Sequence, residues 1–448
     1  MSSSKIDLDG FLSTLKDRTP GENAFHQAVN EVIPDLIPVV NETPAYRDAA
    51  ILERLTEPDR IVSFRVEWRD DDNVAHVNRG YRVQFNSAIG PYKGGLRFHP
   101  SVNQSILKFL GFEQTFKNAL TGLPMGGGKG GADFDPSGRS DDEIMRFCQS
   151  FMQELHRHIG PDIDIPAGDI NVGTREIGWM FGEYRRITNR FAGVLTGKGL
   201  AFGGSEMRTE ATGYGVVQFL CHMLAEHNDQ IDGKTIVISG AGNVATFAAE
   251  LAVCNGGKVV TLSDSKGFIH DKNGLTQDKI DWVRDHKSKP GASLEAYADE
   301  FDATWHADKT PWDVACDAAL PCATQNELGE DGAKALIDNG CKVIVEGANM
   351  PTTTEAKDAF REAGVLFAPG KAANAGGVAV SGLEISQNRQ RRSQSRDDLA
   401  EALKDIMQDI HDNCAEAGKT GDGVDYTTGA NVAGFKKVAD AMCAAGIA

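Results

Sequence analysis

The sequence lacks three features that mark common classes of protein. None of its apolar runs approaches the ~20 residues of a membrane-spanning helix, and its start, Met1-Ser-Ser-Ser-Lys-Ile-Asp, lacks the charged and then apolar pattern of a signal peptide. It also lacks positive charge: 46 Lys and Arg stand against 64 Asp and Glu, a net charge of -18. Nucleic-acid backbones are bound through excess Lys and Arg. We therefore expect a soluble protein that binds neither membranes nor nucleic acid.

Cysteine pairs with metal or redox spacing are also missing. The eight cysteines include no C-x-x-C pair and no Cys/His cluster with zinc spacing. His156 and His158 are two residues apart, which places them on different faces of a helix. We therefore expect reduced thiols, a cytoplasmic location and no metal site.

What the sequence does contain indicates a globular protein of two domains. Its 448 residues are too many for one core, and its 41% hydrophobic and 25% charged residues are typical of globular chains. We expect residues 1–200 to form a substrate-binding and oligomerisation domain with a mixed sheet, residues 201–380 a dinucleotide-binding domain, and residues 381–448 helices that return to the first domain. The fold class is therefore α/β.

Residues 123–131, Leu-Pro-Met-Gly-Gly-Gly-Lys-Gly-Gly, embed Lys129 among glycines. Without a Cβ, such a loop can approach a small polar ligand closely and present the lysine to it. A phosphate loop is the poorer interpretation, because Ser or Thr should follow the lysine and Gly130 stands there. A glycine-rich connector with a solvated lysine remains an equal alternative from this stretch alone.

Further charged residues accompany Lys129. Lys93 is also flanked by glycine, and the helix expected over about 105–120 carries Gln114 and Lys117 on one face, three residues apart. A strand expected over 162–169 ends in a Pro-Ala-Gly turn that leaves Asp169 at its tip, where scaffolds commonly place functional residues. Three lysines and one carboxylate suit a dianionic substrate.

Other segments of the first domain are expected to form its framework and contain no candidate catalytic residues. Apolar residues at helical spacing fill the first sixty positions, and residues 60–68 and 74–85 alternate as an antiparallel pair around a turn at 70–73. Edges of that pair could join subunits. Helices are expected over about 141–159 and 174–189.

The second domain opens with a dinucleotide-binding fingerprint. Residues 234–240 form an apolar strand, Gly240-Ala-Gly-Asn-Val-Ala follows, a helix runs to about 255, and a second strand over 258–264 ends in Asp264. The first glycine makes the turn, and Gly242 lets a pyrophosphate approach the helix N-terminus. Strands and helices then alternate to about 368, which predicts a doubly wound parallel sheet.

Two asparagines, Asn349 and Asn374, fall just past strand ends, where open α/β sheets bind ligands. Each could contact the nicotinamide or its ribose, or each could simply be a turn residue. The tail contains an amphipathic helix over about 397–417 and a last helix from about 431.

With these features together, the sequence closely resembles the glutamate dehydrogenases, specifically the hexameric NADP-dependent type of bacteria and fungi. The resemblance spans almost the whole chain and is carried by long motifs, which begin at Gly90, Leu123, Pro166, Arg208, Glu346 and Asn374. It implies a homohexamer that catalyses reversible oxidative deamination of L-glutamate to 2-oxoglutarate and ammonium with NADP(H).

The resemblance also assigns roles to individual residues. Lys129 would be the catalytic lysine and Asp169 the acid and base that transfers protons. Lys93 and Ser381 would hold the side-chain carboxylate of the substrate. The remaining assigned residues would bind the α-carboxylate end (Gln114, Lys117 and the Gly168 backbone) or the cofactor (Thr212, Gly242, Asn243, Val244, Ser263, Asp264, Asn349 and Asn374).

Two questions stay open at this level. An acid such as Asp264 at the end of the second strand normally accepts from a ribose 2′-OH and favours NAD, whereas the resemblance favours NADP with Lys266, Arg284, Lys287 and Lys289 as candidate phosphate partners. Branched-chain or aromatic amino-acid dehydrogenases, or a catalytically silent nucleotide sensor, are rival interpretations. The presence of Lys93 disfavours the first rival, and the retained Lys117, Lys129 and Asp169 disfavour the second.

Overall fold

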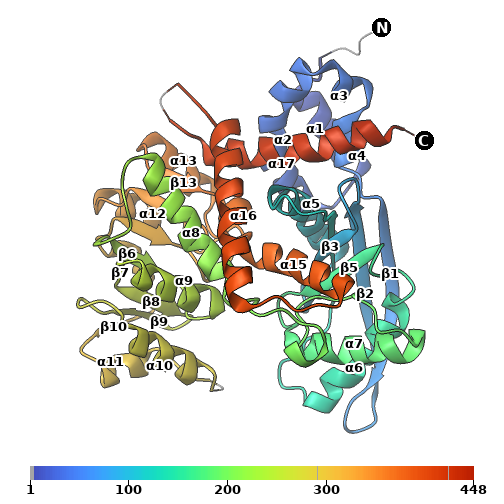
Figure 1. Ribbon diagram of the computed structural model, residues 1–448, viewed down its shortest axis with the longest axis horizontal. Helices are drawn as coiled ribbons and strands as arrows, with labels where there is room; N and C mark the ends of the chain where they lie inside the picture. Colours follow the sequence, from blue (N-terminus) through green and yellow to red (C-terminus); the bar gives the residue numbers. More distant parts are fainter. Residues whose placement is uncertain (1–4, 290, 422, 448) are drawn as a thin grey trace. The chain divides into compact units, whose positions relative to one another are not determined.

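A computed structural model describes residues 5–289, 291–421 and 423–447. The chain forms two compact units, each described here by itself (Figure 1). Unit 1 contains Met1–Glu206, Ser381–Arg396 and Asn431–Ala448, and unit 2 contains Met207–Val380 and Asp397–Ala430. The tail that the sequence assigned as one segment, 381–448, is therefore divided between the units.

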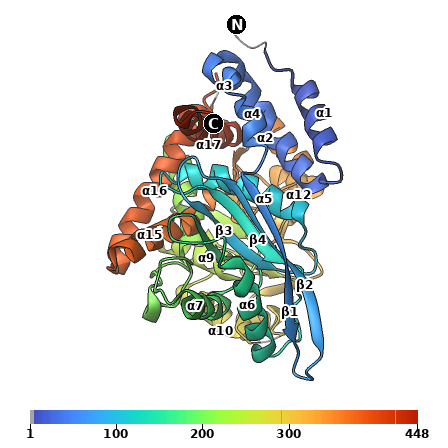
Figure 2. The same cartoon turned by 90° about the vertical axis from the view of Figure 1, so that its right-hand side faces the viewer.

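Unit 1 is built on a mixed five-stranded sheet in the order β1-β2-β4-β3-β5 (Figure 2). Its strands are β1 (Arg60–Arg69), β2 (Ala75–Asn86), β3 (Tyr92–Phe98), β4 (Gly127–Ala132) and β5 (Asp164–Gly168). β1 and β2 form the predicted antiparallel pair, and β2 also runs antiparallel to β4. β3 lies parallel to both β4 and β5. The mixed sheet confirms the predicted α/β class for this unit.

The glycine-rich stretch that we expected to be a loop is instead largely a central strand, β4. Glycine has a low strand propensity, so the sequence pattern argued against this assignment. Close packing explains it: a Cβ on Gly94 would lie 1.7 Å from the carbonyl oxygen of Gly128, and a Cβ on Gly127 would lie 2.0 Å from Thr115 Oγ1. Only bare backbone fits between β3 and the helix that covers β4.

Helices of unit 1 pack against separate parts of this sheet. α5 (Gln104–Leu120) lies on β2 and β4 and also contacts α2 (Asn23–Glu42), where the rings of Phe25, Phe85 and Phe112 meet. α6 (Asp141–Leu155) packs on β1 and on α7 (Thr174–Thr188) around a second aromatic core. The remaining short elements that begin in this unit are α1 (Leu8–Arg18), α3 (Pro44–Asp48), α4 (Ile51–Leu55) and the 3-10 turn η1 (Leu200–Phe202).

Unit 2 contains the predicted doubly wound sheet, with five parallel strands in the order β13-β12-β11-β6-β7. Their bounds are β6 (Thr235–Ile238), β7 (Lys258–Val259), β11 (Ala318–Leu320), β12 (Val343–Val345) and β13 (Leu366–Ala368). A second, antiparallel sheet consists of β8 (Thr261–Asp264), β9 (Gly267–His270) and β10 (Thr304–Ala307). The single strand expected over 258–264 is therefore divided into β7 and β8, because β8 pairs with β9.

Helices of unit 2 alternate with these strands, as predicted. Around the sheets lie α8 (Ala211–Glu226), α9 (Asn243–Cys254), α10 (Gln277–Lys287), α11 (Glu295–Glu300), η2 (Pro311–Asp313), α12 (Glu330–Asp338), α13 (Thr354–Glu362) and α14 (Gly370–Ala373). Over the parts of the chain that the structure describes, no helix combines the length and apolar character needed to cross a membrane.

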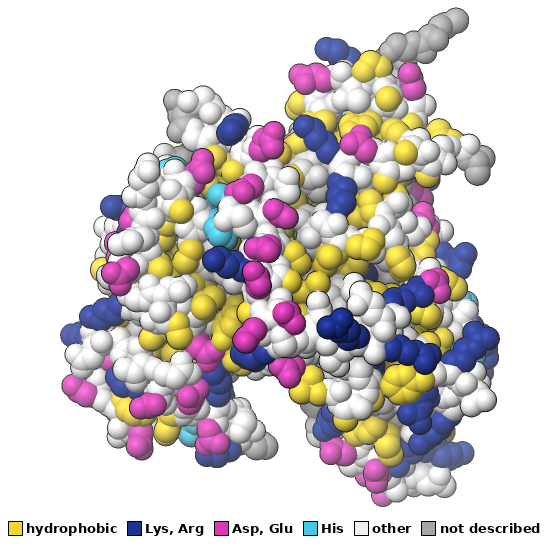
Figure 3. Space-filling model, viewed as in Figure 1, with side chains coloured by type: hydrophobic (Ala, Val, Ile, Leu, Met, Phe, Trp, Pro, Cys, Tyr) yellow, Lys and Arg dark blue, Asp and Glu magenta, His cyan; other side chains and the backbone are white. Residues whose placement is uncertain are grey.

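Three long helices complete the chain: α15 (Gly376–Gln390), α16 (Arg396–Ala417) and α17 (Tyr426–Ala445). α16 buries Leu399, Leu403 and Met407, as its amphipathic pattern predicted, and acidic side chains follow its exposed face (Figure 3). α17 begins five residues before its predicted start because the Asp425 carboxylate accepts from the Thr427 and Thr428 N–H groups at 2.9 and 3.0 Å and caps the helix.

Replacement of Gly94 by Ala tests the close packing of β3 on β4. The new Cβ would displace the Gly128 carbonyl, so we expect unfolding to be easier by about 3 kcal/mol. The control is Gly182→Ala in α7, where an added Cβ meets nothing within 4 Å and a small gain, up to about 1 kcal/mol, is expected. Thermal unfolding followed by circular dichroism measures both. Equal behaviour of the two variants would contradict the packing argument.

Candidate active site

Lys129 lies in β4 and is 5% exposed. The sheet register places Leu96 of β3 beside Gly130 of β4 and beside Gly168 of β5. The residues that follow on β3 and β5 are Arg97 and Asp169, so their side chains meet at the same place. Lys129 Nζ lies 3.1 Å from Asp169 Oδ1, and Arg97 Nε lies 2.7 Å from Asp169 Oδ2.

Burial sets the protonation of this cluster. Burial lowers the pKa of the Lys129 amine, and the charges of Arg97 and Arg82 lower it further, although Asp169 acts in the opposite direction. Burial alone would raise the pKa of Asp169, but the cations of Lys129 and Arg97 outweigh it and the pKa falls well below its ordinary range. Burial and the neighbouring charges therefore disfavour the charged form of the Lys129 amine and favour the charged form of the Asp169 carboxylate.

A second buried cation supports the first group. Arg82 donates through Nε to Asp164 Oδ2 at 2.8 Å and through its terminal nitrogens to Asp164 Oδ1 and to the Gly94 carbonyl oxygen, and both ionic side chains are fully buried. Gln84 Nε2 donates to Asp164 Oδ2 at 3.0 Å. These contacts tie β2, β3 and β5 together beside the Lys129 cluster.

Lys93 lies in β3 and is 2% exposed. Its Nζ donates to Thr196 Oγ1 at 2.8 Å, and Thr196 N–H donates to the Pro166 carbonyl oxygen at 3.0 Å. Asn118 of α5 donates to the Lys93 carbonyl oxygen at 3.0 Å and accepts from Gln114 Nε2 at 2.7 Å. The structure therefore connects Gln114 with Lys93 through Asn118.

The other predicted substrate residues of unit 1 lie on neighbouring elements. Lys117 is partly exposed on α5, three residues after Gln114. Gly168 ends β5, one residue before Asp169. Ser381 is buried in α15, which packs on the segment before β4: a Cβ on the adjacent Gly382 would lie 2.5 Å from Leu123 Cδ1.

Within unit 2 the fingerprint residues form the turn between β6 and α9. Gly240 has φ +86° and a Cβ there would lie 3.0 Å from the Cys322 carbonyl oxygen, so only glycine suits the position. Gly242 precedes Asn243 and Val244 at the start of α9, and among the described residues no side chain caps this helix end. A Cβ on Gly242 would meet nothing within 4 Å. The helix N–H groups are therefore open to an anion such as a pyrophosphate.

The acidic end of β8 is already occupied by hydrogen bonds. Asp264 Oδ1 accepts from Lys266 N–H at 2.9 Å, and Oδ2 accepts from Leu294 N–H at 2.9 Å and Lys287 Nζ at 3.0 Å. Burial raises the pKa of Asp264, but these donors outweigh it and the pKa is lowered. The neighbouring Ser263 Oγ accepts from Gly240 N–H at 2.7 Å and joins β8 to the fingerprint turn.

The two asparagines that follow strands come together. Asn374 Nδ2 donates to Asn349 Oδ1 at 3.2 Å and to the Ala348 carbonyl oxygen at 3.0 Å. Asn374 is buried and Asn349 is exposed, so Asn374 fixes the loop and Asn349 faces outward. Thr212 lies in the first turn of α8 against Gly377, where a Cβ would be 2.3 Å from its Oγ1.

Comparison with known proteins decides the family. Residues 203–446 match the model of Glutamate/Leucine/Phenylalanine/Valine dehydrogenase, and residues 58–186 match the Glu/Leu/Phe/Val dehydrogenase dimerisation domain. The chain belongs to the Glu/Leu/Phe/Val dehydrogenase family.

Individual members of the dehydrogenase family are similar over the whole length. An NADP-specific glutamate dehydrogenase of Salmonella typhimurium is 56% identical over 98% of both chains. An NAD-specific glutamate dehydrogenase of Bacteroides fragilis is 54% identical over 99% of this chain and 100% of that protein. The crystal structure of Plasmodium falciparum glutamate dehydrogenase superposes with a TM-score of 0.96, at 48% identity, over 98% of this chain and 94% of that one.

Several residues of this family member were missed in the sequence. Arg97 binds the predicted site residue Asp169, Thr196 binds Lys93, and the buried pair of Arg82 and Asp164 supports the cluster. Arg97 lies within the motif that begins at Gly90, two residues after a glycine pair. This position was the feature of the sequence that could have identified it as a site residue. Three of the candidate phosphate partners already bind carboxylates in the dehydrogenase: Arg284 binds Glu250 at 2.6 Å, Lys289 binds Asp285 at 2.9 Å and Lys287 binds Asp264 at 3.0 Å.

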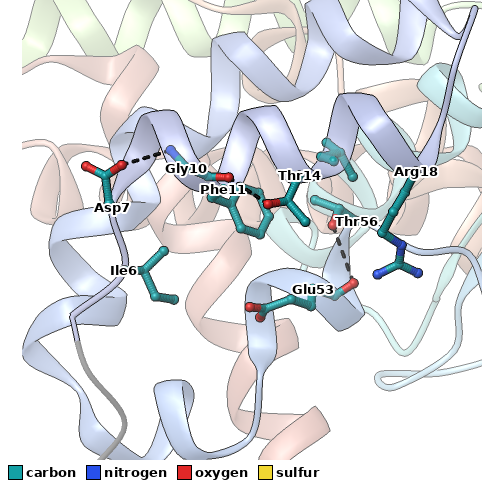
Figure 4. Close-up of a pocket in the computed structure, with 9 residues that line it drawn as sticks. Ile6, Asp7, Gly10, Phe11, Thr14, Arg18, Glu53 and Thr56 are labelled. Carbon is teal, nitrogen blue, oxygen red and sulfur yellow. Dashed lines mark hydrogen bonds between the residues drawn. The ribbon is translucent and has the colours of Figure 1, made fainter.

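A separate hollow of about 390 Å³ lies between α1 and α4 (Figure 4). Phe11 and Thr14 line it from α1, and Glu53 lines it from α4. It contains none of the predicted site residues, so we do not assign it to the chemistry.

Replacement of Arg97 by Gln tests the electrostatic argument for Lys129. The Lys129 amine should titrate below 10.5 in the parent, and its pKa should rise in Arg97→Gln because a repelling cation is gone. The pH dependence of acylation at Lys129, quantified by mass spectrometry, measures the midpoint. Arg65→Gln, which removes an exposed arginine paired with Glu67, is the control and should leave it unchanged. Equal midpoints in parent and Arg97→Gln would contradict the assignment.

Proposed function

We propose that this chain is an NADP-dependent glutamate dehydrogenase, which interconverts L-glutamate with 2-oxoglutarate and ammonium. Membership of the family and the glutamate dehydrogenases similar over the full length support this activity. The observation that carries the proposal is the buried Lys129 amine 3.1 Å from the Asp169 carboxylate, in the same unit as the buried cation of Lys93.

Charge complementarity argues for glutamate among the substrates of this family. Lys93 and Ser381 would hold the side-chain carboxylate, whereas Gln114, Lys117 and the Gly168 backbone would hold the α-carboxylate end. The distal carboxylate of glutamate would give the buried Lys93 ammonium an anionic contact, whereas an apolar leucine or valine side chain would not. Lys93 therefore selects an acidic side chain over an apolar one.

Lys129 and Asp169 would divide the proton transfers. The neutral Lys129 amine accepts a proton from the water that attacks the carbon of the imino substrate, and the lowered pKa increases the fraction of the amine in this form. Asp169 transfers protons to and from the substrate nitrogen. NADP, when bound, supplies the acceptor for the hydride from the substrate α-carbon.

The residues of unit 2 fit a dinucleotide with a 2′-phosphate. Asn243, Val244 and Gly242 would receive the pyrophosphate at the open N-terminus of α9. Thr212, Ser263, Asn349 and Asn374 are proposed as further cofactor contacts. Leu294, Lys266 and Lys287 already donate to Asp264, so only one of the acceptor positions of its carboxylate is left for a ribose hydroxyl. Lys287, which is paired with Asp264 at the end of β8, is proposed to bind the 2′-phosphate of NADP.

The assembly is proposed to be a homohexamer in the cytoplasm, as the resemblance implies. The matched dimerisation domain, residues 58–186, supports association of subunits. β1 is an edge strand of its sheet and offers unpaired backbone groups. Sedimentation equilibrium measures the number of 48.2 kDa chains.

Replacement of Lys129 by Ala tests the activity and the catalytic role together. We expect the parent to oxidise NADPH when 2-oxoglutarate and ammonium are added, followed by absorbance, and the variant to turn over at least ~1000-fold more slowly. The variant should keep its fold and its NADPH affinity. Lys16→Ala, on the exposed surface of α1, should behave as the parent. Near-parental turnover in Lys129→Ala would refute the role.

Replacement of Lys287 by Met tests the cofactor proposal. Loss of a charge-assisted contact to the 2′-phosphate should lower the ratio of kcat/KM for NADPH to that for NADH by ~10 to 100-fold. The matched control is Lys289→Met, two residues further on, where an exposed lysine is paired with Asp285. If Lys287→Met lowers both rates in parallel, Lys287 does not select the phosphate.

A further inference from the structure

A fully buried ion pair lies beside the predicted substrate carboxylate site of unit 1. Lys198 Nζ and Glu384 Oε1 are 2.8 Å apart, and both side chains are 0% exposed. Glu384 Oε2 accepts from Gly197 N–H at 2.9 Å, and Lys198 also donates to the Leu195 carbonyl oxygen. Each polar atom of the pair is therefore used to hold the loop over residues 195–198.

Thr196 occupies the middle of this loop. Its hydroxyl accepts from Lys93 Nζ at 2.8 Å, and its N–H is fixed on the Pro166 carbonyl oxygen of β5. Glu384 stands three residues after Ser381 on α15, so both share one face of the helix. One carboxylate thus links the helix that carries Ser381 to the loop that carries Thr196.

Neighbouring side chains of α15 also bind the chain that follows this loop, near Gly203 and Ser205. Asn388 Nδ2 donates to the Gly203 carbonyl oxygen at 3.0 Å, and Gln387 Nε2 donates to Ser205 Oγ at 2.8 Å. A Cβ on Gly193 would lie 2.8 Å from the Asn388 Cβ, so the backbone is packed directly on the helix. The position of Thr196 is therefore set by α15 and not by the loop alone.

Lys198 is not a further substrate cation. Its charge is enclosed, bound to Glu384, and 5.8 Å from the Phe181 ring. Buried ion pairs are commonly replaceable by apolar residues without loss of stability, because removing both charges from water costs as much as their attraction returns. A contribution to stability therefore does not explain why this buried pair is present. Fixing the position of the loop over residues 195–198 does explain it.

We propose that Glu384 and Lys198 are positioning residues that set the preference for a substrate with a distal carboxylate. They act by fixing Thr196 against Lys93, so that the Lys93 ammonium keeps one orientation. This inference rests on the proposed glutamate dehydrogenase function.

The double variant Lys198→Met with Glu384→Leu tests it, because it removes both charges and leaves no buried ion alone. We expect the ratio of kcat/KM for 2-oxoglutarate to that for 2-oxopentanoate, which has a methyl group in place of the distal carboxylate, to fall at least ~10-fold. The change should lie in the KM for 2-oxoglutarate, and the KM for NADPH should stay as in the parent.

The matched control is Lys108→Met with Glu22→Leu, a Lys–Glu pair at 2.9 Å in the same unit with both side chains largely buried. It should leave the substrate ratio unchanged. A loss of both substrates in parallel, or an equal fall in the control, would show a merely structural role and overturn the inference. Lys198→Gln with Glu384→Gln, which also removes both charges and allows a hydrogen bond between the two side chains, provides the same readout if the first double variant does not fold.

A double-mutant cycle with Thr196→Val locates the effect. If the Lys198–Glu384 pair acts through Thr196, removing the pair should change the substrate ratio little in a Thr196→Val background. Additive effects of the pair and of Thr196→Val on that ratio would contradict the proposal. A parent that does not oxidise NADPH with 2-oxoglutarate and ammonium would instead overturn the proposed function itself. The two failures are therefore distinguishable.

Discussion

The structure of unit 1 depends on one steric constraint, the contact of bare backbone between β3 and β4. The Gly128 carbonyl oxygen occupies the space where Gly94 would carry a Cβ, and Thr115 of α5 occupies that of Gly127. Because β4 has almost no side chains of its own, α5 can lie directly on it. Lys129 is the exception in this strand, and it is surrounded by close-packed backbone that excludes water from its stem.

This exclusion of water decides the chemistry of the lysine. A surface pair of Lys and Asp would hold the amine in its charged form, since the carboxylate raises the pKa of the ammonium. Here burial lowers the pKa of Lys129, and the positive charge of Arg97 lowers it further. Arg97 also pairs with the Asp169 carboxylate. The charges that lower the pKa of Lys129 are those of two arginines, Arg97 and Arg82, and burial is the larger effect.

Local signals in the sequence predicted the fold class and the elements that carry the candidate site residues. The β6–α9 turn, Lys129 and Asp169 could be named because each lies in a short motif whose residue types have a direct physical reason. The β4 strand could not be predicted, because glycine favours turns unless a neighbour forbids a Cβ, and that neighbour is remote in sequence. Thr196 and Glu384 could not be predicted for the same reason: their partners Lys93 and Lys198 are about 100 and 190 residues away.

Asp264 shows that a motif residue can also have a structural role. The rule that an acid after the second strand binds the ribose 2′-OH assumes that its carboxylate is free. In this chain the acid accepts from two backbone N–H groups and one lysine, and both backbone groups belong to segments that the fingerprint does not include. The acid therefore serves to hold Lys287 and the residues near Leu294 in place. The sequence motif shows which residue stands at this position. The fold determines how many of its hydrogen-bonding positions remain for a cofactor, and the cofactor preference depends on those remaining positions.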